Sequence, residues 1–261
     1  MFKDQLHREL HIKATPKRIV SLVPSQTELL VDLGLETSIV GVTKFCVHPN
    51  RLRKEKTIVG GTKEVHFNKI KALNPDIILC NKEENTKEMI SELEQIAPVH
   101  ISDIYTLEDS LELIKMYGDV FDVVEKAESI SDEITVKRKA FQEFQIEKPK
   151  LKVAYFIWKN PWMVAANQTF INEILSLNNF ENVYQDVNRY PEITLPELKE
   201  KQIDVILLSS EPYPFKEDDL AELKFVFPET KIIIVDGEAF SWYGSRLIKA
   251  FDYFEELQNL L

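Results

Sequence analysis

Runs of Val, Ile and Leu alternate along this chain with segments of helical periodicity, and this alternation limits the fold more than any other feature. Several runs are apolar at every position, as expected of parallel strands that helices cover on both faces. The pattern is typical of α/β units with mostly parallel central sheets. The predicted strands are 18–23, 38–43, 76–80, 99–101, 152–157, 163–166, 204–208 and 231–235.

The order of these elements repeats between the two halves of the chain. Residues 68–79 parallel residues 196–207, since both contain a helical stretch, a tight turn, an aspartate and a strand. We therefore predict two similar lobes, an N-terminal α/β lobe at 1–121 and a C-terminal α/β lobe at 148–261.

The segment between the lobes carries no strand pattern. Helical spacing resumes at about Val123 and continues to Pro149, where the missing amide hydrogen and the ring end a helix. About 25 helical residues span about 37 Å, and the segment is rich in Glu, Lys and Arg where a flexible linker would be rich in Gly, Ser or Pro. We predict one long, rigid connecting helix at 122–147 and a ligand cleft between the lobes.

Two sequence patterns predict where helices begin. Ser25 and Glu28 have the spacing of a capping box, in which a hydroxyl and a carboxylate three residues apart bond each other's backbone amides. Thr194 and Glu197 have the same spacing, with Pro196 in the first turn, where proline is tolerated.

The charge balance narrows the choice of partners. The chain carries 32 Lys and Arg against 43 Asp and Glu, a net charge of −11. Nucleic-acid-binding domains usually present a basic face and anionic lipid attracts basic segments, so we expect no nucleic acid partner and no membrane insertion. The first residues have no apolar stretch typical of a signal peptide. We expect a monomer that is cytoplasmic as encoded, or periplasmic or in the cell envelope if a signal has been removed.

The sequence holds no complete catalytic or metal-binding motif. The glycine pair at 60–61 lacks the spacing of a phosphate-binding loop, so we expect a turn there. Cys46 and His48 form at most half a metal site, and ordinary loop packing is the simpler interpretation. Cys80, like Cys46, flanks a strand-like run, which is typical of buried thiols. We therefore expect no enzyme activity, no catalytic residue, no metal site and no required cofactor.

Aromatic residues gather in the loops that follow predicted strands, and all three tryptophans lie in such loops. Ligands of open α/β sheets bind at the carboxyl ends of strands, so one interpretation is a ligand cleft lined by these loops. The other is that Trp and Tyr side chains pin the loops to the body of the protein. The candidate ligand-binding residues are Pro24, Ser25, Phe45, His48, Trp158, Trp162, Tyr190, Glu211, Tyr213, Trp242, Tyr243 and Arg246.

Arg246 has two possible roles. At the start of the predicted last helix it would add a cation to the positive end of the helix dipole, an arrangement suited to an amide, carboxylate or phosphate group. Alternatively, it would form an ion pair between the lobes with Glu211 or Glu238.

Residues 16–25, Leu33-Gly34-Leu35, Val40-Gly41-Val42 and Asn74-Pro75-Asp76 together form a pattern that resembles the class III solute-binding proteins, the helical-backbone metal receptor family. These proteins serve ABC importers of cobalamin, haem and iron siderophores. The resemblance extends over nearly the whole chain and implies two lobes that hold a metal chelate between them.

The cobalamin-binding branch is the one that the chain resembles most. Its members hold the corrinoid largely by apolar and aromatic contacts, and Tyr190-Pro191 falls where that branch carries an aromatic–proline pair. None of the side chains needs to coordinate cobalt. The resemblance implies that Pro24, Ser25, Phe45, Trp158, Trp162, Tyr190, Trp242 and Arg246 face the ligand.

One departure from the family concerns the partner protein. Family members present a glutamate near a helix start on each lobe, which docks on permease arginines. Asn68 and Pro196 stand at the matching positions here, with Glu197 beside the second. The expected function is non-catalytic binding of a cobalamin-like corrinoid, in an ABC-type uptake system or by a non-exported relative. The alternatives are an iron-siderophore or haem binding protein and, in another class, an enzyme or a protein-interaction module.

Overall fold

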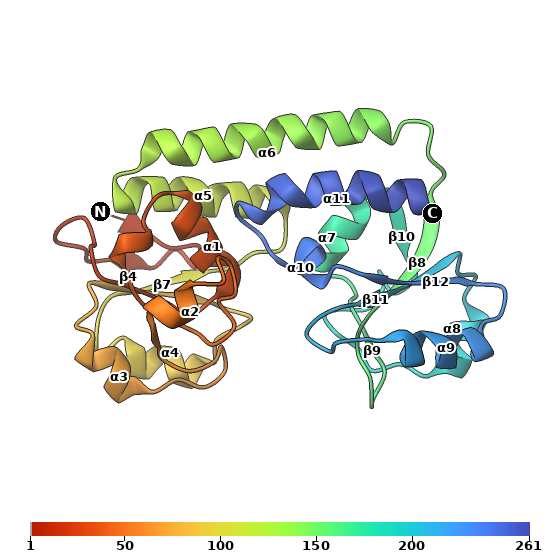
Figure 1. Cartoon of the computed structure of the whole chain (residues 1–261), viewed down its shortest axis with the longest axis horizontal. Helices are drawn as coiled ribbons and strands as arrows, with labels where there is room; N and C mark the ends of the chain where they lie inside the picture. Colours follow the sequence, from red (N-terminus) through yellow and green to blue (C-terminus); the bar gives the residue numbers. More distant parts are fainter. Residues whose placement is uncertain (1) are drawn as a thin grey trace. The chain divides into compact units, whose positions relative to one another are not determined.

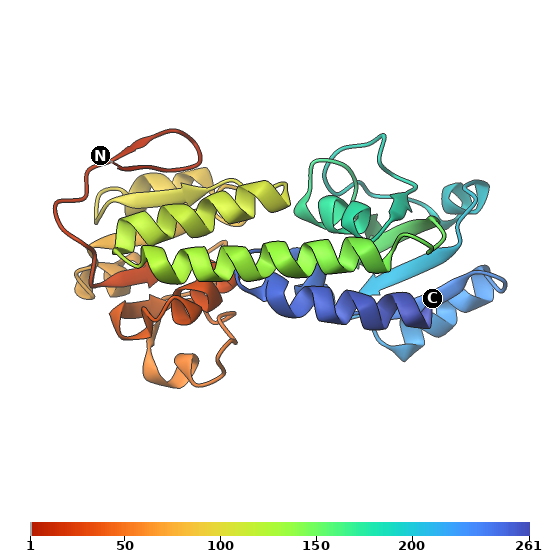
Figure 2. The same cartoon turned by 90° about the horizontal axis from the view of Figure 1, so that it is seen from above.

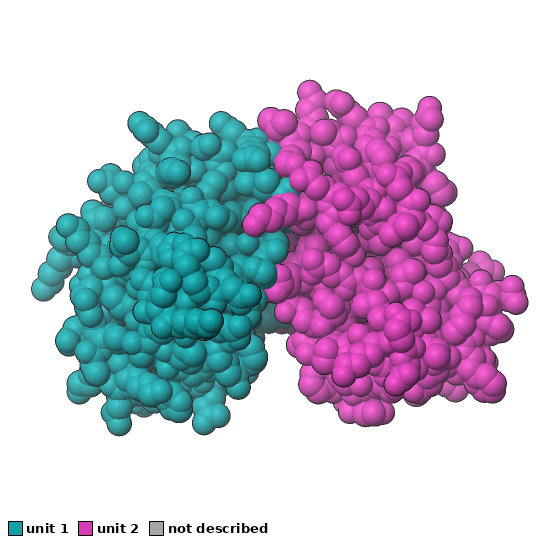
Figure 3. All heavy atoms as spheres, viewed as in Figure 1, with its two compact units in different colours: residues 1–104, 108–135, 243–248 teal, residues 105–107, 136–242, 249–261 magenta. Residues whose placement is uncertain are grey.

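The predicted alternation of strands and helices is present in the computed structural model, which describes residues 2–261 (Figure 1). The chain divides into two units, which Figure 3 shows in separate colours. Unit 1 comprises the described residues up to Ile104, Glu108–Thr135 and Tyr243–Ile248, and unit 2 comprises Tyr105–Leu107, Val136–Trp242 and Lys249–Leu261. The lobe boundaries drawn from the sequence stay a prediction.

The sheet of unit 1 has five parallel strands in the order β5-β4-β3-β6-β7. All residues of β3, β6 and β7 are buried, which explains why these stretches are so rich in Ile, Val and Leu. Each fully buried side chain of this kind stabilises the fold by about 1.5–3 kcal/mol. The strands are β3 Ile19–Ser21, β4 Ile39–Val42, β5 Thr57–Ile58, β6 Ile77–Asn81 and β7 Val99–Ser102.

The remaining elements of unit 1 are helices and a short hairpin. The helices are α1 Pro24–Asp32, the 3-10 turn Glu36–Ser38, α2 Leu52–Glu55, α3 Phe67–Ala72, α4 Lys87–Leu93 and, except for its first residue, α5 Leu107–Phe121. The hairpin pairs β1 Phe2–Lys3 with β2 Glu9–Leu10. It is fixed to the edge strand β7, because Arg8 donates to the Val99 carbonyl at 2.7 Å and Asp4 accepts from the Ile101 amide at 3.2 Å. The hairpin thereby protects an edge that would otherwise be open to pairing with another chain.

Of the two predicted helix starts, one is confirmed. Thr194 and Glu197 form a capping box at the start of α8 Leu195–Glu200. The capping box predicted at Ser25 is wrong, because α1 begins one residue earlier at Pro24 with no side-chain cap. Proline has its φ preset for the first helical position and has no amide hydrogen to satisfy there.

The sheet of unit 2 has the order β10-β8-β11-β12, with all of these pairs parallel, and a short β9 lies antiparallel to β8. The strands are β8 Leu151–Trp158, β9 Met163–Val164, β10 Phe180–Asn182, β11 Val205–Ser209 and β12 Lys231–Val235. The helices are α7 Phe170–Leu177, α8, α9 Glu217–Val226, α10 Gly237–Ser241 and most of α11 Arg246–Leu260. The prediction of two α/β lobes with mostly parallel sheets is confirmed.

The long helix predicted between the lobes is α6 Val124–Phe144, which ends a few residues earlier than expected. Its first twelve residues belong to unit 1 and the others to unit 2. Within unit 2, α6 lies alongside α11 (Figures 1 and 2), where Phe141 contacts Phe251 and Phe254 at ring distances of 5.8 and 6.0 Å. Across residues 2–261, no helix combines the length and the apolar character needed to span a membrane.

Candidate ligand-binding site

Two candidate ligand-binding residues open α1 at the carboxyl edge of the unit 1 sheet. Pro24 and Ser25 follow β3 almost directly, and both are buried. The Ser25 side chain interacts with the Tyr243 hydroxyl and acts to lower its pKa, against the larger effect of burial. The structure therefore brings Ser25 and Tyr243 together, although they are far apart in the sequence.

A buried polar network that the sequence analysis missed surrounds Tyr243. The Gln26 amide nitrogen donates to Ser102 Oγ at 2.6 Å and to the Tyr243 hydroxyl at 3.0 Å. The Tyr117 hydroxyl in turn donates to Gln26 Oε1 at 2.7 Å. Burial raises the pKa of both tyrosines, so both hydroxyls stay protonated and neutral. The position of Gln26 directly after Pro24 and Ser25 was the one sequence signal for this network.

Arg246 forms an ion pair that the sequence analysis did not predict, with Glu28. The Arg246 guanidinium Nε donates to Glu28 at 2.8 Å, and the two side chains are only 12% and 5% exposed. The physical reason is that Tyr243–Ile248 belongs to unit 1, where it meets the helix that carries Glu28. Glu211 binds other donors, described below.

The loop after β4 carries Phe45 and His48. The Phe45 side chain is 48% exposed, with the Lys44 ammonium 5.0 Å from its ring centre, and His48 is half-buried. Cys46 between them is fully buried and hydrogen-bonded to Thr27 and Thr43, and burial raises the pKa of its thiol. Cys80 is likewise a buried free thiol, as predicted. Among residues 2–261 there is no group of three or more His, Cys, Asp or Glu side chains that could hold a metal ion.

Four aromatic side chains of unit 2 gather after β8 and β11, and we call them the aromatic cluster: Trp158, Trp162, Tyr213 and Phe215. Trp158 meets Tyr213 at 5.6 Å, Tyr213 meets Phe215 at 4.7 Å, and Phe215 stacks on Trp162 at 6.2 Å with an interplanar angle of 2°. Trp158 ends β8 and is 40% exposed, so the cluster is open to solvent at this side chain. Three of the four are candidate ligand-binding residues, and the structure brings them together.

Lys159 is the cation that contacts this cluster. Its ammonium lies 5.3 Å from the Trp162 ring centre, and it donates to Asp219 at 2.7 Å and to Glu222 at 2.6 Å. Hydrogen bonds to these two carboxylates raise its pKa. Its charge is therefore compensated by acidic side chains of α9.

Glu211 and Trp242, both candidate ligand-binding residues, bind each other. The Trp242 indole nitrogen donates to Glu211 Oε1 at 2.8 Å, and the Ser241 hydroxyl donates to the same oxygen at 3.0 Å. Burial raises the pKa of Glu211 although both donors oppose that shift. These contacts fix the loop after β12 to the loop after β11.

Tyr190 lies in a separate group with Arg189 and Tyr105. The Arg189 guanidinium lies 5.5 Å from the Tyr190 ring centre and 5.9 Å from that of Tyr105, within the range of cation–π attraction. It also donates to the Gln168 carbonyl at 2.8 Å. The Tyr190 side chain is half-buried.

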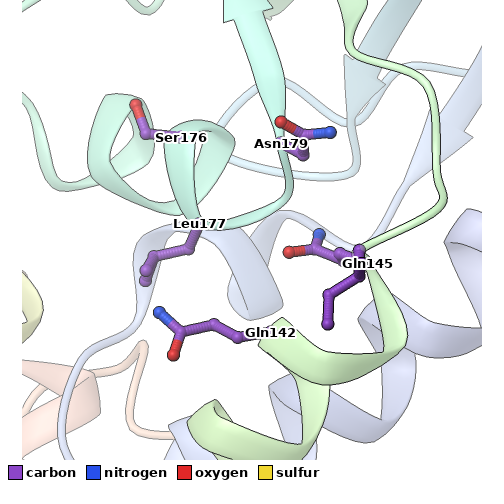
Figure 4. A pocket seen from close by; sticks show the side chains of 6 residues that line it. Gln142, Gln145, Ser176, Leu177 and Asn179 are labelled. Atoms are coloured by element: carbon purple, nitrogen blue, oxygen red, sulfur yellow. The ribbon is translucent and has the colours of Figure 1, made fainter.

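Two hollows of unit 2 were not predicted from the sequence. The larger has a volume of about 520 Å³ and is lined by Tyr105, Thr106, Asn167, Gln168, Thr169, Asn172 and Glu173. The smaller, of about 350 Å³, lies at the ends of α6 and α7 and is lined by Gln142, Gln145, Ile146, Ser176, Leu177 and Asn179 (Figure 4). The run Asn167-Gln168-Thr169 after β9 was the only local signal for the larger one.

The two positions that match the family's docking glutamates are on the surface. Asn68 is exposed on α3, and Pro196 is exposed on α8. Glu197 beside it closes the capping box with Thr194, and these hydrogen bonds lower its pKa.

Parallel α/β units with aromatic side chains in the loops after their strands are suited to binding a small solute. The chain belongs to the periplasmic binding protein family, which matches residues 19–226. The family predicted from the sequence is therefore confirmed. Its members and the relatives below are binding proteins.

Two relatives match by sequence. One, from Bacillus subtilis, is named an uncharacterized ABC transporter substrate-binding lipoprotein and is 26% identical over 97% of this chain and 83% of its own length. The other is the vitamin B12-binding protein of Pectobacterium carotovorum, 25% identical over 91% of this chain and 86% of its own.

Two solved structures share the fold. The periplasmic vitamin B12-binding protein of Vibrio cholerae has a TM-score of 0.82 at 19% identity and covers 94% of this chain and 98% of its own. A periplasmic haem-binding protein of Pseudomonas aeruginosa has a TM-score of 0.80 at 21% identity, with 93% and 92% covered. At these identities the likeness establishes the fold alone.

Proposed function

We propose that this protein binds a cobalamin-like corrinoid, without catalysis, as the solute-binding component of an ABC-type importer. The observation that carries the ligand is the aromatic cluster with its exposed member Trp158. A corrin ring presents broad apolar faces, and aromatic side chains bury such faces with little loss of side-chain entropy. The vitamin B12-binding relative supports the same ligand class.

Charge separates a corrinoid from the alternative ligands. Haem carries anionic propionates, and ferric siderophores of the catecholate or carboxylate type are anionic, so their sites gain from an uncompensated cation. Lys159, the cation at the cluster, is paired with Asp219 and Glu222, and Arg246 is paired with Glu28. A neutral, amide-bearing corrinoid does not need those charges. Haem or siderophore binding is the second candidate, and the test below includes both.

The partner we propose is the permease of an ABC importer, reached outside the cytoplasmic membrane. Support comes from the relatives that are named a lipoprotein and a periplasmic protein. Asn68 and Pro196 imply that docking relies on contacts other than two glutamates. Capture of the intact, ligand-loaded protein by a reconstituted cognate permease supports the partner, and no capture with or without ligand contradicts it.

The ligand is tested by titrating tryptophan fluorescence, with inner-filter controls, using cyanocobalamin, haem and a ferric siderophore in turn. We expect cyanocobalamin alone to quench saturably at one equivalent, and Trp158→Ala to weaken binding about tenfold or more, as for an aromatic anchor. Phe225→Ala is the matched control, because Phe225 is 90% exposed on α9 and outside the cluster. Saturable binding of haem or the siderophore instead of cyanocobalamin contradicts the proposal.

A further inference from the structure

The larger pocket of unit 2 is lined by residues with polar groups, and all of them but Glu173 are uncharged. The turn after β9 and the first turn of α7 supply the amide side chains of Asn167, Gln168 and Asn172. Hydroxyl groups come from Tyr105, Thr106 and Thr169, and Glu173 is the carboxylate of the lining. Its volume of about 520 Å³ lies within the range of small-molecule sites, about 300–1,000 Å³.

Two successive hydrogen bonds determine which atom of the Asn172 side-chain amide, the oxygen or the nitrogen, is hydrogen-bonded within the protein. The Tyr184 backbone N–H donates to Asn182 Oδ1 at 3.1 Å, so this atom must be an oxygen. The amide nitrogen of Asn182 then donates to Asn172 Oδ1 at 2.9 Å. The Asn172 oxygen is thus occupied, and its Nδ2 has no partner among residues 2–261.

Asn167 is oriented by a similar argument. The Gln168 backbone N–H donates to Asn167 Oδ1 at 2.8 Å, so this oxygen is also occupied. Its Nδ2 group likewise has no partner in the part of the chain that the structure describes. Two asparagines of the lining therefore retain N–H donors, and the Glu173 carboxylate supplies acceptors.

We propose that this pocket binds a primary carboxamide arm of the ligand, an inference that rests on the proposed corrinoid function. A primary carboxamide has a carbonyl oxygen, which accepts from the Asn167 and Asn172 amides, and an NH₂ group, which donates to Glu173. The corrin ring carries several such arms, whereas haem carries carboxylates at its edge. A carboxylate arm would lose the donated bond and meet the Glu173 charge.

The placement of the pocket agrees with this role. Its Asn167 wall is paired with the segment that presents Tyr190, since the Arg189 amide donates to the Asn167 carbonyl at 2.7 Å. The Arg189 side chain is not part of the lining; its guanidinium binds the Gln168 carbonyl and lies over Tyr105 and Tyr190. Tyr190 therefore directly follows the residue whose backbone is hydrogen-bonded to Asn167 of the pocket wall.

The test compares cyanocobalamin with its monocarboxylic derivatives, in each of which one carboxamide has been hydrolysed to a carboxylate. We expect the wild-type protein to bind at least one isomer about tenfold or more weakly than the parent, the loss of one hydrogen bond to a charged group. Glu173→Gln removes the carboxylate charge and should bind this isomer more tightly, so the difference in affinity between the parent and this isomer should become smaller. Asn172→Asp keeps the acceptor for Asn182 but removes the N–H donor, so it should weaken binding of the parent about tenfold.

Gln142→Glu is the matched control, because it also exchanges a side-chain amide for a carboxylate but does so in the smaller pocket (Figure 4). It should leave the affinities for cyanocobalamin and for its monocarboxylic derivatives unchanged. Thermal unfolding of each variant shows that it is folded. If cyanocobalamin binds but no isomer is discriminated, or the two pocket variants behave as Gln142→Glu does, the carboxamide site is wrong and the corrinoid function stands. If no corrinoid binds the wild-type protein, both fail.

Discussion

Trp242 and Tyr243 are adjacent in the chain, yet their polar atoms are bound within different units. The Trp242 indole donates to Glu211 in unit 2, whereas the Tyr243 hydroxyl accepts from Gln26 in unit 1. At the Trp242–Tyr243 peptide bond the chain therefore passes from unit 2 to unit 1, and a side-chain hydrogen bond holds it on each side. Two of the candidate ligand-binding residues therefore have a structural role.

Tyr243→Phe should destabilise unit 1, because it removes the hydroxyl from a buried network and leaves Gln26 with one fewer partner. We expect the free energy of unfolding in urea to fall by about 1–3 kcal/mol. Tyr184→Phe is the control, since the buried Tyr184 hydroxyl has no hydrogen-bond partner within residues 2–261. Its removal should be neutral or slightly stabilising. Equal losses in the two variants would contradict the role of the network.

Acid should weaken the native state through His100 on β7. Burial lowers the pKa of this imidazole from 6.5 to about 4, and nearby Asp4 opposes the shift while Arg8 adds to it. The unfolded chain therefore binds this proton at higher pH than the folded chain does. Stability is unaffected by His100 above about pH 6.5, falls by about 3 kcal/mol between pH 6.5 and 4, and is level below that.

The measurement is urea unfolding of the wild-type protein and His100→Leu across this pH range. The difference in unfolding free energy between the wild-type protein and His100→Leu should change by most of the roughly 3 kcal/mol expected for His100. The variant should become more stable relative to the wild type as the pH falls. His66→Leu, at an exposed position, serves as the control. A constant difference between wild type and His100→Leu would exclude His100 as the source.

The strands and the Thr194 capping box were predictable because they depend on residues close together in the sequence. All eight predicted strands are present, with ends shifted by a few residues at most. The two-residue strands β1, β2 and β5 and the three-residue β10 were missed, since they lie outside the longer apolar runs from which strands were predicted. The capping box at Ser25 failed because the neighbouring Pro24 starts the helix.

The site was predictable only in part, because many of its contacts join residues that are far apart in the sequence. The aromatic loop residues after β8 and β11 were expected to line a ligand cleft, which stays a prediction; the structure brings them together because parallel strands end at one edge of a sheet. The pairing of Arg246 with Glu28 was not predicted, since the two residues are 218 positions apart in the sequence. The orientation of Asn172 depends on Asn182, whose position is set by the pairing of β10 with β8. No local pattern reports such contacts.

The Glu28–Arg246 pair should show strong coupling. Both side chains are nearly buried, so removing one partner takes this ion pair from the other in a poorly solvated place, at a cost of about 3–5 kcal/mol. Glu28→Gln and Arg246→Gln should each be costly, whereas the double variant should lose clearly less than the sum. A double-mutant cycle in urea measures this, with the exposed Arg51–Glu36 pair as the reference. Additive losses would contradict the coupling.

Gly237→Ala should disturb the contact between Glu211 and Trp242. A Cβ atom at position 237 would lie 2.4 Å from the Ser209 hydroxyl oxygen and 2.7 Å from Glu211 Cγ, so the Glu211 loop must move. We expect a loss of about 1–3 kcal/mol, as in other overpacked positions, together with a changed Trp242 signal in near-UV circular dichroism. Gly61→Ala is the control, because its nearest contact is the Phe45 ring at 3.3 Å and it lies in unit 1. If Gly237→Ala also lowers corrinoid affinity, the Glu211–Trp242 contact positions the ligand loops. If both glycine variants leave stability and the tryptophan signal unchanged, the close approach at Gly237 does not constrain this loop.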